Sequence, residues 1–229
     1  MLNLQKISAI TLDLDDTLWP IWPTIERAEQ ALQHFLLGHA PRASALFADP
    51  AARLALRHEV MAAQPELLHQ LGALRLAQIQ LALLRSDEDG ALAEPAFEVF
   101  FDERNRVTLF DDVLPALTFL SARFPLVAVS NGNADLARVG LAGYFKAGFS
   151  AQVFGVGKPD RRIFEAAADA AGVPPEEVLH IGDDAELYVL AALACGMQTA
   201  WVNREDKLWP HAAEPHETVR SLAELTALF

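Results

Sequence analysis

The sequence ITLDLDDTL occupies residues 10–18 and has three acidic residues, at positions 13, 15 and 16, after a short apolar run. Residues 7–12 are mostly apolar, which is typical of a strand buried on both faces of a parallel sheet. Asp13 and Asp15 follow at the point where this predicted strand ends. Ligands of open α/β sheets bind beyond the carboxyl ends of the strands, so we expect both carboxylates to face a binding crevice.

The same pattern, a short apolar run followed by a polar or glycine-bearing turn, recurs in the second half of the chain. Helical stretches alternate with these runs. The alternation predicts an α/β fold, a doubly wound parallel sheet with right-handed crossovers. The predicted strands are residues 7–12, 126–129, 178–181 and 199–202, and the predicted helices of this part are residues 113–122, 161–171 and 185–195.

Between these parts the pattern changes to helices without convincing strands. Leu67, Leu71 and Leu74 recur at i, i+4 and i+7, which forms an apolar stripe that needs a partner helix. The expected helices cover approximately residues 23–38, 51–63, 65–84 and 94–103.

This change of pattern predicts two domains. Residues 1–18 and 110–229 form the predicted core, and residues 19–109 form a helical-bundle insertion after the first strand. The alternative is that these helices simply cover one face of the sheet. The oligomeric state stays open, because an apolar face of the bundle could meet either the core or another subunit.

The charge balance argues against some partners. The chain has 18 Lys and Arg against 31 Asp and Glu, a net charge of −13. Nucleic-acid backbones and anionic membrane surfaces would be repelled at long range, so we expect neither as a partner. An anionic small substrate would need local cations.

The sequence also favours a cytoplasmic location. It contains no uncharged apolar stretch of about 18 residues that could span a bilayer. The first residues lack the apolar run and the cleavage site of a secretory signal. Cys195 is the single cysteine, so an internal disulfide is excluded, which fits a reducing compartment.

Further polar residues are expected beside the first two carboxylates. Ser130 and Asp183 follow two other predicted strands, and the carboxyl ends of parallel strands meet at one edge of the sheet. Lys158 precedes a predicted helix and could reach the same space. Together with Asp13, these groups suit a metal ion and a phosphoryl group.

The pair Asp13 and Asp15 allows a division of labour, in which one carboxylate attacks phosphorus and the other transfers protons. Attack by a carboxylate on a phosphate brings two anions together, so a divalent cation and a lysine are needed to lower their repulsion. Mg²⁺ fits, since it prefers oxygen ligands. An Asp-x-Asp pair alone does not specify this chemistry, because paired acids also occur in turns and calcium loops.

Four stretches resemble the motifs of the haloacid dehalogenase-like (HAD) hydrolases, and they occur in that family's order. The insertion between the first two motifs is similar to the family's helical cap of the C1 type. The resemblance implies a Rossmannoid core with such a cap. The four stretches are ITLDLDDTL at residues 10–18, VSNG at 129–132, GKPD at 157–160 and HIGDD at 180–184.

The resemblance also implies the roles of the matching residues. Asp13 would be the nucleophile and Asp15 the general acid and base. Mg²⁺ would be held by Asp13, by the backbone carbonyl of Asp15 and by Asp183. The phosphate would be bound by Ser130, Asn131 and Lys158, with Lys158 also balancing the charge.

Asp15 separates two activities found in this family. Dehalogenases lack an acid at this position, because a departing halide needs no proton, whereas the alkoxide of a phosphate ester does. Asp15 therefore favours a phosphatase that acts on a small-molecule phosphate ester.

The substrate is suggested by a closer resemblance. LVAVSNGNA at residues 126–134 and CGMQ at 195–198 are similar to bacterial members that serve riboflavin biosynthesis. That resemblance implies 5-amino-6-(5-phospho-D-ribitylamino)uracil or flavin mononucleotide (FMN) as substrate. The cap segment matches less distinctly, so another sugar phosphate or a nucleotide stays open. A non-catalytic protein that binds a phosphometabolite is the rival from another class.

Tyr188 departs from the family pattern, which usually has another aspartate near the metal at this position. Asp184 or Glu186 could supply the missing charge. Alternatively, Tyr188 packs within its helix and the three ligands suffice; we favour this interpretation, since changes around metal ligands usually alter affinity ~10–100-fold without abolishing binding. Tyr188→Asp tests the position: a role near the metal predicts a tighter Mg²⁺ dependence, and an unchanged magnesium titration would reject that role.

Five further residues are candidate site residues. Four of them also have a structural interpretation. Trp19 and Trp22 could stack on a flavin-like or nucleobase-like ring, or pack between core and cap. Arg75 could contact the substrate or form a structural ion pair. Asp184 could instead cap a helix. Thr17, within the first motif, is a further candidate.

Overall fold

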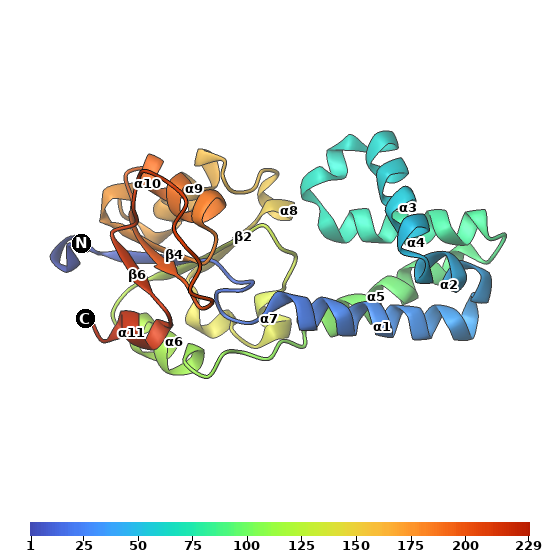
Figure 1. Cartoon of the computed structure of the whole chain (residues 1–229), viewed down its shortest axis with the longest axis horizontal. Coiled ribbons are helices and arrows are strands. Elements are labelled where there is room, and N and C mark those ends of the chain that lie inside the picture. The colour runs from blue at the N-terminus through green and yellow to red at the C-terminus, as the bar shows by residue number, and fades with distance from the viewer. The chain divides into compact units, whose positions relative to one another are not determined.

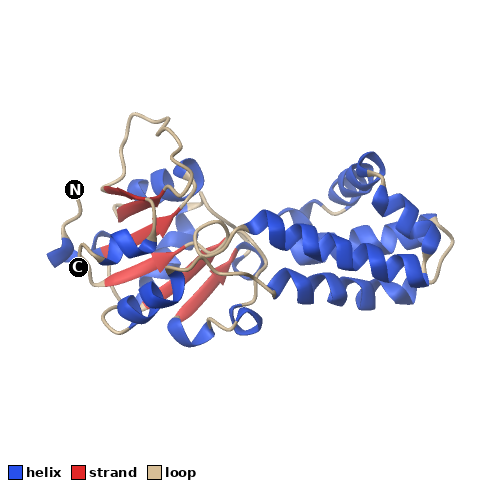
Figure 2. Ribbon diagram, turned by 60° about the horizontal axis from the view of Figure 1, so that its bottom comes forward, coloured by secondary structure: helices blue, strands red, loops and turns tan.

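Six parallel strands form one sheet in the order β3-β2-β1-β4-β5-β6, drawn in red in Figure 2. The structure is a computed structural model that describes all residues, 1–229. β1 lies inside the sheet, paired with β2 on one side and β4 on the other. The strands are β1 (Ala9–Leu12), β2 (Leu126–Ser130), β3 (Ala147–Ser150), β4 (Val178–Gly182), β5 (Gln198–Val202) and β6 (Glu217–Val219).

Helices cover both faces of this sheet (Figure 1). α9 packs on β1, β2 and β3 through an apolar cluster that includes Ala9, Val127 and Phe164. α6 and α11 contact each other on the other face. Every residue of β1, β2, β4 and β5 is buried, which explains their continuous apolar runs. The helices here are α6 (Val113–Ser121), α8 (Ala151–Phe154), α9 (Arg161–Ala171), α10 (Ala191–Ala194) and α11 (Leu222–Thr226), with 3₁₀ helices at Leu4–Lys6, Ala142–Tyr144 and Pro175–Glu177.

The predicted α/β fold class is confirmed, and the four predicted strands are present within two residues of their expected bounds. β3 and β6 are additional edge strands. Their sequences, AGFS and ETV, are short and not apolar throughout, so the pattern did not indicate them. The predicted helix at residues 185–195 was wrong in one respect: it begins as a π-helix at Ala185–Leu190 and continues as the short α10.

The chain divides into two compact units. The sheet unit comprises Met1–Pro20, Thr108–Gly132 and Gly140–Phe229, and the helical unit comprises Ile21–Val107 and Asn133–Val139. Within the helical unit, a buried apolar core joins side chains of the first five α-helices. These helices are α1 (Ile21–His39), α2 (Pro41–Ala48), α3 (Pro50–Ala63), α4 (Leu71–Arg85) and α5 (Ala93–Asn105), followed later in the chain by α7 (Leu136–Val139).

The helix predicted at residues 65–84 is interrupted. Residues Pro65–His69 form a 3₁₀ helix, and α4 begins only at Leu71. A further 3₁₀ helix covers Gly90–Leu92. Leu67 and Leu74 nevertheless pack together in one buried cluster, as their helical spacing predicted. No helix of the structure combines the length and the apolar character needed to cross a membrane.

Candidate active site

The carboxyl ends of three neighbouring strands bring the predicted site residues of the sheet unit together. Leu12 of β1 is in register with Ala128 of β2 and with Ile181 of β4. Asp13 follows directly, and its backbone N–H donates to the Ile181 carbonyl at 2.9 Å. Ser130 ends β2, and Asp183 follows β4. The parallel register therefore carries these side chains to the same edge of the sheet.

Lys158 and Asp13 form a buried ion pair. The Lys158 ammonium donates to Oδ1 of Asp13 at 2.5 Å and to the backbone carbonyl of Val129 at 2.5 Å. Both side chains are almost fully buried, at 0% and 1% exposure. Burial raises the pKa of Asp13, while the neighbouring Lys158 charge opposes this rise. Burial lowers the pKa of Lys158, opposed by Asp13. Each charge thus depends on the other for its stability in this environment.

Asn131 holds the segment that carries this lysine. Its side-chain oxygen accepts from the Lys158 N–H at 2.7 Å, and its side-chain nitrogen donates to the Lys158 carbonyl at 2.8 Å. Gly157 permits this approach, since a Cβ there would lie 2.5 Å from Oδ1 of Asn131. The contacts of the Asn131 side chain are therefore those of a residue that positions Lys158.

Ser130 is buried at the end of β2, beside the ion pair. Its hydroxyl oxygen accepts a hydrogen bond from the backbone N–H of Gly132 at 2.9 Å. A serine hydroxyl can accept and donate at once, so the O–H hydrogen is available to another acceptor. This arrangement suits a donor to a phosphate oxygen.

Asp15 is half-buried and held by Trp19. The indole N–H of Trp19 donates to Oδ1 of Asp15 at 2.8 Å, and the two residues also form a parallel β-bridge. Trp19 is completely buried, so neither face of its ring is exposed to a ligand. Between them, Asp16 adopts a left-handed backbone with φ of 59°. The tight loop after β1 thus fixes the orientation of the Asp15 carboxylate.

Thr17 connects two of the acids. Its hydroxyl lies 3.3 Å from Oδ2 of Asp13 and 3.1 Å from Oδ1 of Asp183. Burial, together with the charges of Asp13 and Asp16, raises the pKa of Asp183 to about 8. Thr17 therefore links Asp13 and Asp183, and the proximity of the other carboxylates adds to the effect of burial on Asp183.

Two residues that were not predicted support these acids from the end of β5. The indole N–H of Trp201 donates to the backbone carbonyl of Asp183 at 2.7 Å. Arg204 donates to the backbone carbonyl of Thr17 at 3.0 Å and forms an ion pair with Asp112. Their position at the carboxyl end of a predicted strand was the available signal in the sequence.

The donor set fits a magnesium ion in its chemistry. No group of three or more His, Cys, Asp and Glu side chains in the structure has metal-binding geometry. A metal here would use two carboxylates, those of Asp13 and Asp183, together with a backbone carbonyl. Mg²⁺ commonly takes one or two carboxylates and keeps several waters. Burial is the main cause of the raised pKa of Asp183, and the negative charges of Asp13 and Asp16, which a bound cation would offset, add to it.

Asp184 and Tyr188 belong to the next helical segment. Asp184 caps it, with Oδ1 accepting from the N–H groups of Glu186 at 2.9 Å and Leu187 at 2.7 Å. The ring of Tyr188 lies over the Lys158 ammonium, whose Nζ is 3.5 Å from the ring centroid. Burial and the nearby carboxylates raise the pKa of Tyr188, so its phenol stays neutral.

The other two candidate residues lie in the helical unit. Trp22 is 70% exposed in the first turn of α1. Arg75 forms an ion pair with Glu29 and lies over the ring of Phe100 at 4.7 Å. Its guanidinium therefore already has structural partners within this unit.

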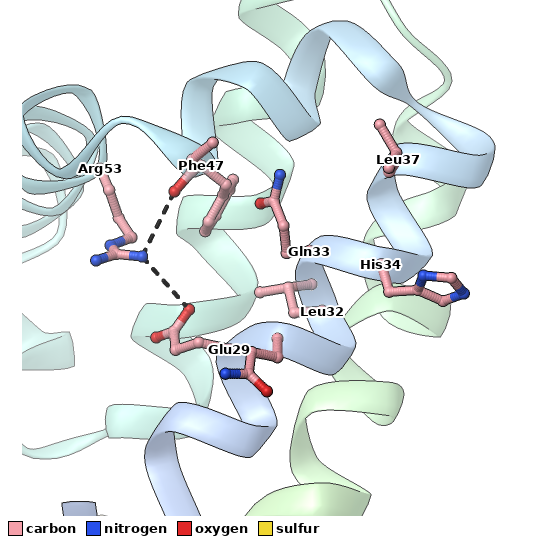
Figure 3. Close-up of a pocket in the computed structure, with 9 residues that line it drawn as sticks. Glu29, Leu32, Gln33, His34, Leu37, Phe47 and Arg53 are labelled. Atoms are coloured by element: carbon pink, nitrogen blue, oxygen red, sulfur yellow. Dashed lines mark hydrogen bonds and ion pairs between the residues drawn. The ribbon is translucent and has the colours of Figure 1, made fainter.

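Glu29 also lines a pocket of this unit. Figure 3 shows Glu29 and Arg53 facing each other, with 3.9 Å between their charged groups. The pocket has a volume of about 400 Å³ and is formed by α1, α2 and α3. Arg75 does not line it, and neither does any predicted residue of the sheet unit.

A model of one protein family matches most of the chain. It covers residues 7–196, and its description is a haloacid dehalogenase-like hydrolase. The chain belongs to the haloacid dehalogenase-like hydrolases. The predicted family is therefore confirmed, and with it the prediction that the protein is an enzyme of this hydrolase class.

Two curated relatives of this HAD-like hydrolase are phosphatases by name. The 5-amino-6-(5-phospho-D-ribitylamino)uracil phosphatase YigB of Escherichia coli (strain K12) is 34% identical, over 98% of this chain and 97% of that protein. The phosphoserine phosphatase of Thermus thermophilus is 30% identical, over 94% of this chain and 96% of that protein. These names support the expected class, a phosphoric monoester hydrolase.

A solved structure that is named as a dehalogenase has the same sequence identity to this HAD-like hydrolase as the Escherichia coli phosphatase. The crystal structure of a 2-haloacid dehalogenase from Pseudomonas syringae pv. Tomato DC3000 is 34% identical and covers 97% of each chain, with a TM-score of 0.91. Family and fold are thus consistent across these relatives. Their names divide between two chemistries.

Proposed function

We propose that this HAD-like hydrolase is a Mg²⁺-dependent phosphatase that cleaves a small-molecule phosphate monoester through an aspartyl phosphate on Asp13. One observation carries the proposal: the buried Asp13 carboxylate is paired with Lys158, while the carboxylate of Asp15, two residues after Asp13, is oriented by the indole N–H of Trp19. A nucleophile with a counter-charge and a separate proton donor is what this reaction requires.

The proposed reaction has two steps. In the first, a carboxylate oxygen of Asp13 forms a bond to phosphorus, the ester P–O bond breaks, and Asp15 donates a proton to the departing oxygen. In the second, Asp15 takes a proton from water, the water oxygen attacks phosphorus, and the bond between Asp13 and phosphorus breaks. The products are the alcohol and inorganic phosphate, and both aspartates return to their starting states.

The remaining residues of the chain have supporting roles in this proposal. The hydroxyl of Ser130 and the Lys158 ammonium would hold the phosphoryl oxygens and stabilise their charge. Asp13, Asp183 and the backbone carbonyl of Asp15 would hold Mg²⁺, which when bound supplies positive charge to the phosphoryl group. The helical unit would act as a cap that excludes water and selects the leaving group.

Dehalogenation is the second candidate, favoured by the name of the Pseudomonas syringae structure. The acid at position 15 argues against it, because loss of a halide needs no proton donor. The two proposals differ in their product, phosphate or halide, so one assay distinguishes them.

For the substrate, we propose 5-amino-6-(5-phospho-D-ribitylamino)uracil, on the basis of the Escherichia coli relative, which matches nearly the whole of both chains. FMN is a second candidate, since it also carries a ribityl phosphate on a nitrogen-containing ring. Phosphoserine, a nucleotide or another sugar phosphate are the alternatives, as the names of other relatives suggest. A cytoplasmic location stays a prediction.

The test is phosphate release from a substrate panel, with Mg²⁺ and with EDTA. The panel contains p-nitrophenyl phosphate, FMN, the ribitylaminouracil phosphate, phosphoserine, a pyrimidine 5′-nucleotide and glyceraldehyde 3-phosphate. We expect Mg²⁺-dependent release that is lost in Asp13→Asn and retained in Asp169→Asn, a matched change at an exposed position.

Other outcomes support other functions. Halide release from 2-chloropropionate without phosphate release would favour the dehalogenase. Phosphate-ester binding in calorimetry without turnover of any panel member would favour a non-catalytic phosphometabolite-binding protein.

A further inference from the structure

Tyr188 occupies the position at which the family resemblance suggested another acid, and it contacts the catalytic lysine instead. Nζ of Lys158 lies 3.5 Å from the centroid of the Tyr188 ring. This distance is well within the ~6 Å at which an ammonium is attracted to the face of an aromatic ring. The contact is therefore a cation–π interaction within the candidate active site.

The hydrogen bonds of Lys158 leave room for this interaction. An ammonium has three N–H donors. One donates to Asp13 and a second to the backbone carbonyl of Val129. The side chain is fully buried, so water does not surround the third donor. The electron-rich face of the Tyr188 ring lies against this same ammonium.

The local fold brings the ring to this place. Tyr188 lies in the π-helix Ala185–Leu190, which begins after the Asp184 cap. π-helical turns are rare and frequently occur at functional sites. Gly182 provides the space, since a Cβ there would lie 3.0 Å from Cδ2 of Tyr188. The ring thus packs directly on the end of β4.

We propose that Tyr188 is a positioning residue, whose ring face holds the Lys158 ammonium against Asp13. The inference rests on the proposed function, because it gives Tyr188 its role through the nucleophile and the lysine that serves it. The family pattern places a negative charge near the metal at this position. In this chain the Tyr188 ring instead supports the Lys158 ammonium.

The experiment varies the ring electrons at constant shape. Tyr188 is replaced by Phe and then by mono-, di- and trifluorophenylalanine through site-specific incorporation. Fluorine withdraws electron density from the ring face and so weakens the attraction for an ammonium, while the size of the ring changes little. The same series at Tyr144, the other tyrosine of the chain, is the matched control.

We expect Tyr188→Phe to retain kcat, because the ring face is kept. Along the fluorinated series kcat should fall stepwise, by about 10–30-fold in total, the rate equivalent of a desolvated cation–π interaction. KM and the Mg²⁺ half-saturation should stay constant, and the series at Tyr144 should be flat. A role in packing alone would leave kcat constant along the series, provided that the unfolding temperature is unchanged.

A second measurement needs no substrate. The ring current of Tyr188 should shift the Lys158 side-chain protons upfield in NMR spectra of protein with labelled lysine. The shift should persist in Tyr188→Phe and disappear in Tyr188→Leu. Lys146→Arg identifies one of the other lysine signals and leaves this shift unaltered.

The outcomes separate the two proposals. An active wild type with constant kcat along the fluorinated series would overturn the positioning role. Tyr188→Asp with higher activity and tighter Mg²⁺ half-saturation would also overturn it, in favour of a position that serves the metal. An upfield-shifted Lys158 in a protein that hydrolyses nothing on the panel would leave the contact in place and reject the phosphatase. Absence of the shift would reject the contact itself.

Discussion

The side-chain amide of Asn131 forms two hydrogen bonds with the backbone of Lys158, accepting from its N–H at 2.7 Å and donating to its carbonyl at 2.8 Å. An amide that pairs with one peptide group in this way fixes the position of the whole residue. The Lys158 ammonium therefore reaches Asp13 from a backbone that is held by Asn131, the residue directly after strand β2.

Loss of the two hydrogen bonds between Asn131 and Lys158 should lower kcat strongly and the unfolding temperature only slightly. We expect Asn131→Ala to lower kcat by about 10–100-fold, since a misplacement near 1 Å can have an effect of this size. Gly157→Ala should have a similar effect, because its Cβ would displace the Asn131 side chain. Steady-state kinetics and thermal unfolding of both variants provide the measurement. A wild-type kcat in Asn131→Ala would show that catalysis does not need these two hydrogen bonds.

Trp19→Phe tests the orientation of Asp15, the proposed general acid. The variant keeps a buried ring but loses the N–H that donates to Asp15. We expect about a tenfold lower kcat with an alkyl phosphate and a smaller effect with p-nitrophenyl phosphate, because nitrophenolate leaves without a proton. Trp209→Phe is the matched control, since its N–H bonds only to a loop carbonyl of Ala213. Equal effects on both substrates would contradict the role of Asp15 as acid.

Thr17→Val tests the link between two proposed metal ligands. Valine has the shape of threonine without the hydroxyl that contacts Asp13 and Asp183. We expect the Mg²⁺ half-saturation to rise about tenfold, the usual size of an effect from groups behind metal ligands, and Thr17→Ser to restore it. Magnesium titrations of activity measure this, with Thr118→Val as an exposed control. An unchanged titration would exclude the link.

The raised pKa of Asp183 predicts how stability depends on pH when metal is absent. The ordinary pKa is 3.8 and the folded value is about 8, so the folded state binds this proton more tightly than the unfolded state. The resulting stabilisation is fully present below pH 3.8 and is lost as the pH rises through 8. In EDTA, the free energy of unfolding should therefore decrease as the pH rises from 3.8 to about 8.

Urea unfolding at a series of pH values measures this dependence. Asp183→Asn should flatten the slope, and Mg²⁺ should restore stability at alkaline pH, because a bound cation replaces the proton. The same slope in wild type and in Asp183→Asn would assign it to another group.

Much of the fold could be predicted from the sequence, because apolar runs and helical spacing are patterns of residues that are neighbours along the chain. A strand buried on both faces has a continuous apolar run, and β1, β2, β4 and β5 were found in this way. The edge strands β3 and β6 lack such runs, because fewer neighbours cover them. The break at Gln70 between a 3₁₀ helix and α4 was missed, since the residues on both sides favour helices.

Some residues of the candidate site could likewise be predicted from the sequence, and others could not. Asp13, Ser130 and Asp183 were expected together because strand ends in a parallel sheet converge. Trp201 and Arg204 were not predicted, although they hold the Asp183 and Thr17 backbones. Their roles depend on a side chain from one strand that reaches the loop after another. No spacing along the chain encodes that distance.

The sequence by itself determined the α/β class, the family and the types of residue present at the strand ends, because these follow from short apolar runs and adjacent motifs. Only the tertiary structure decided what each group contacts. Asn131 was expected to bind phosphate, and its side chain holds Lys158; Tyr188 stood in place of an acid, and its ring covers the ammonium. The physical reason is that such contacts join residues far apart along the chain, and burial makes the partners depend on each other.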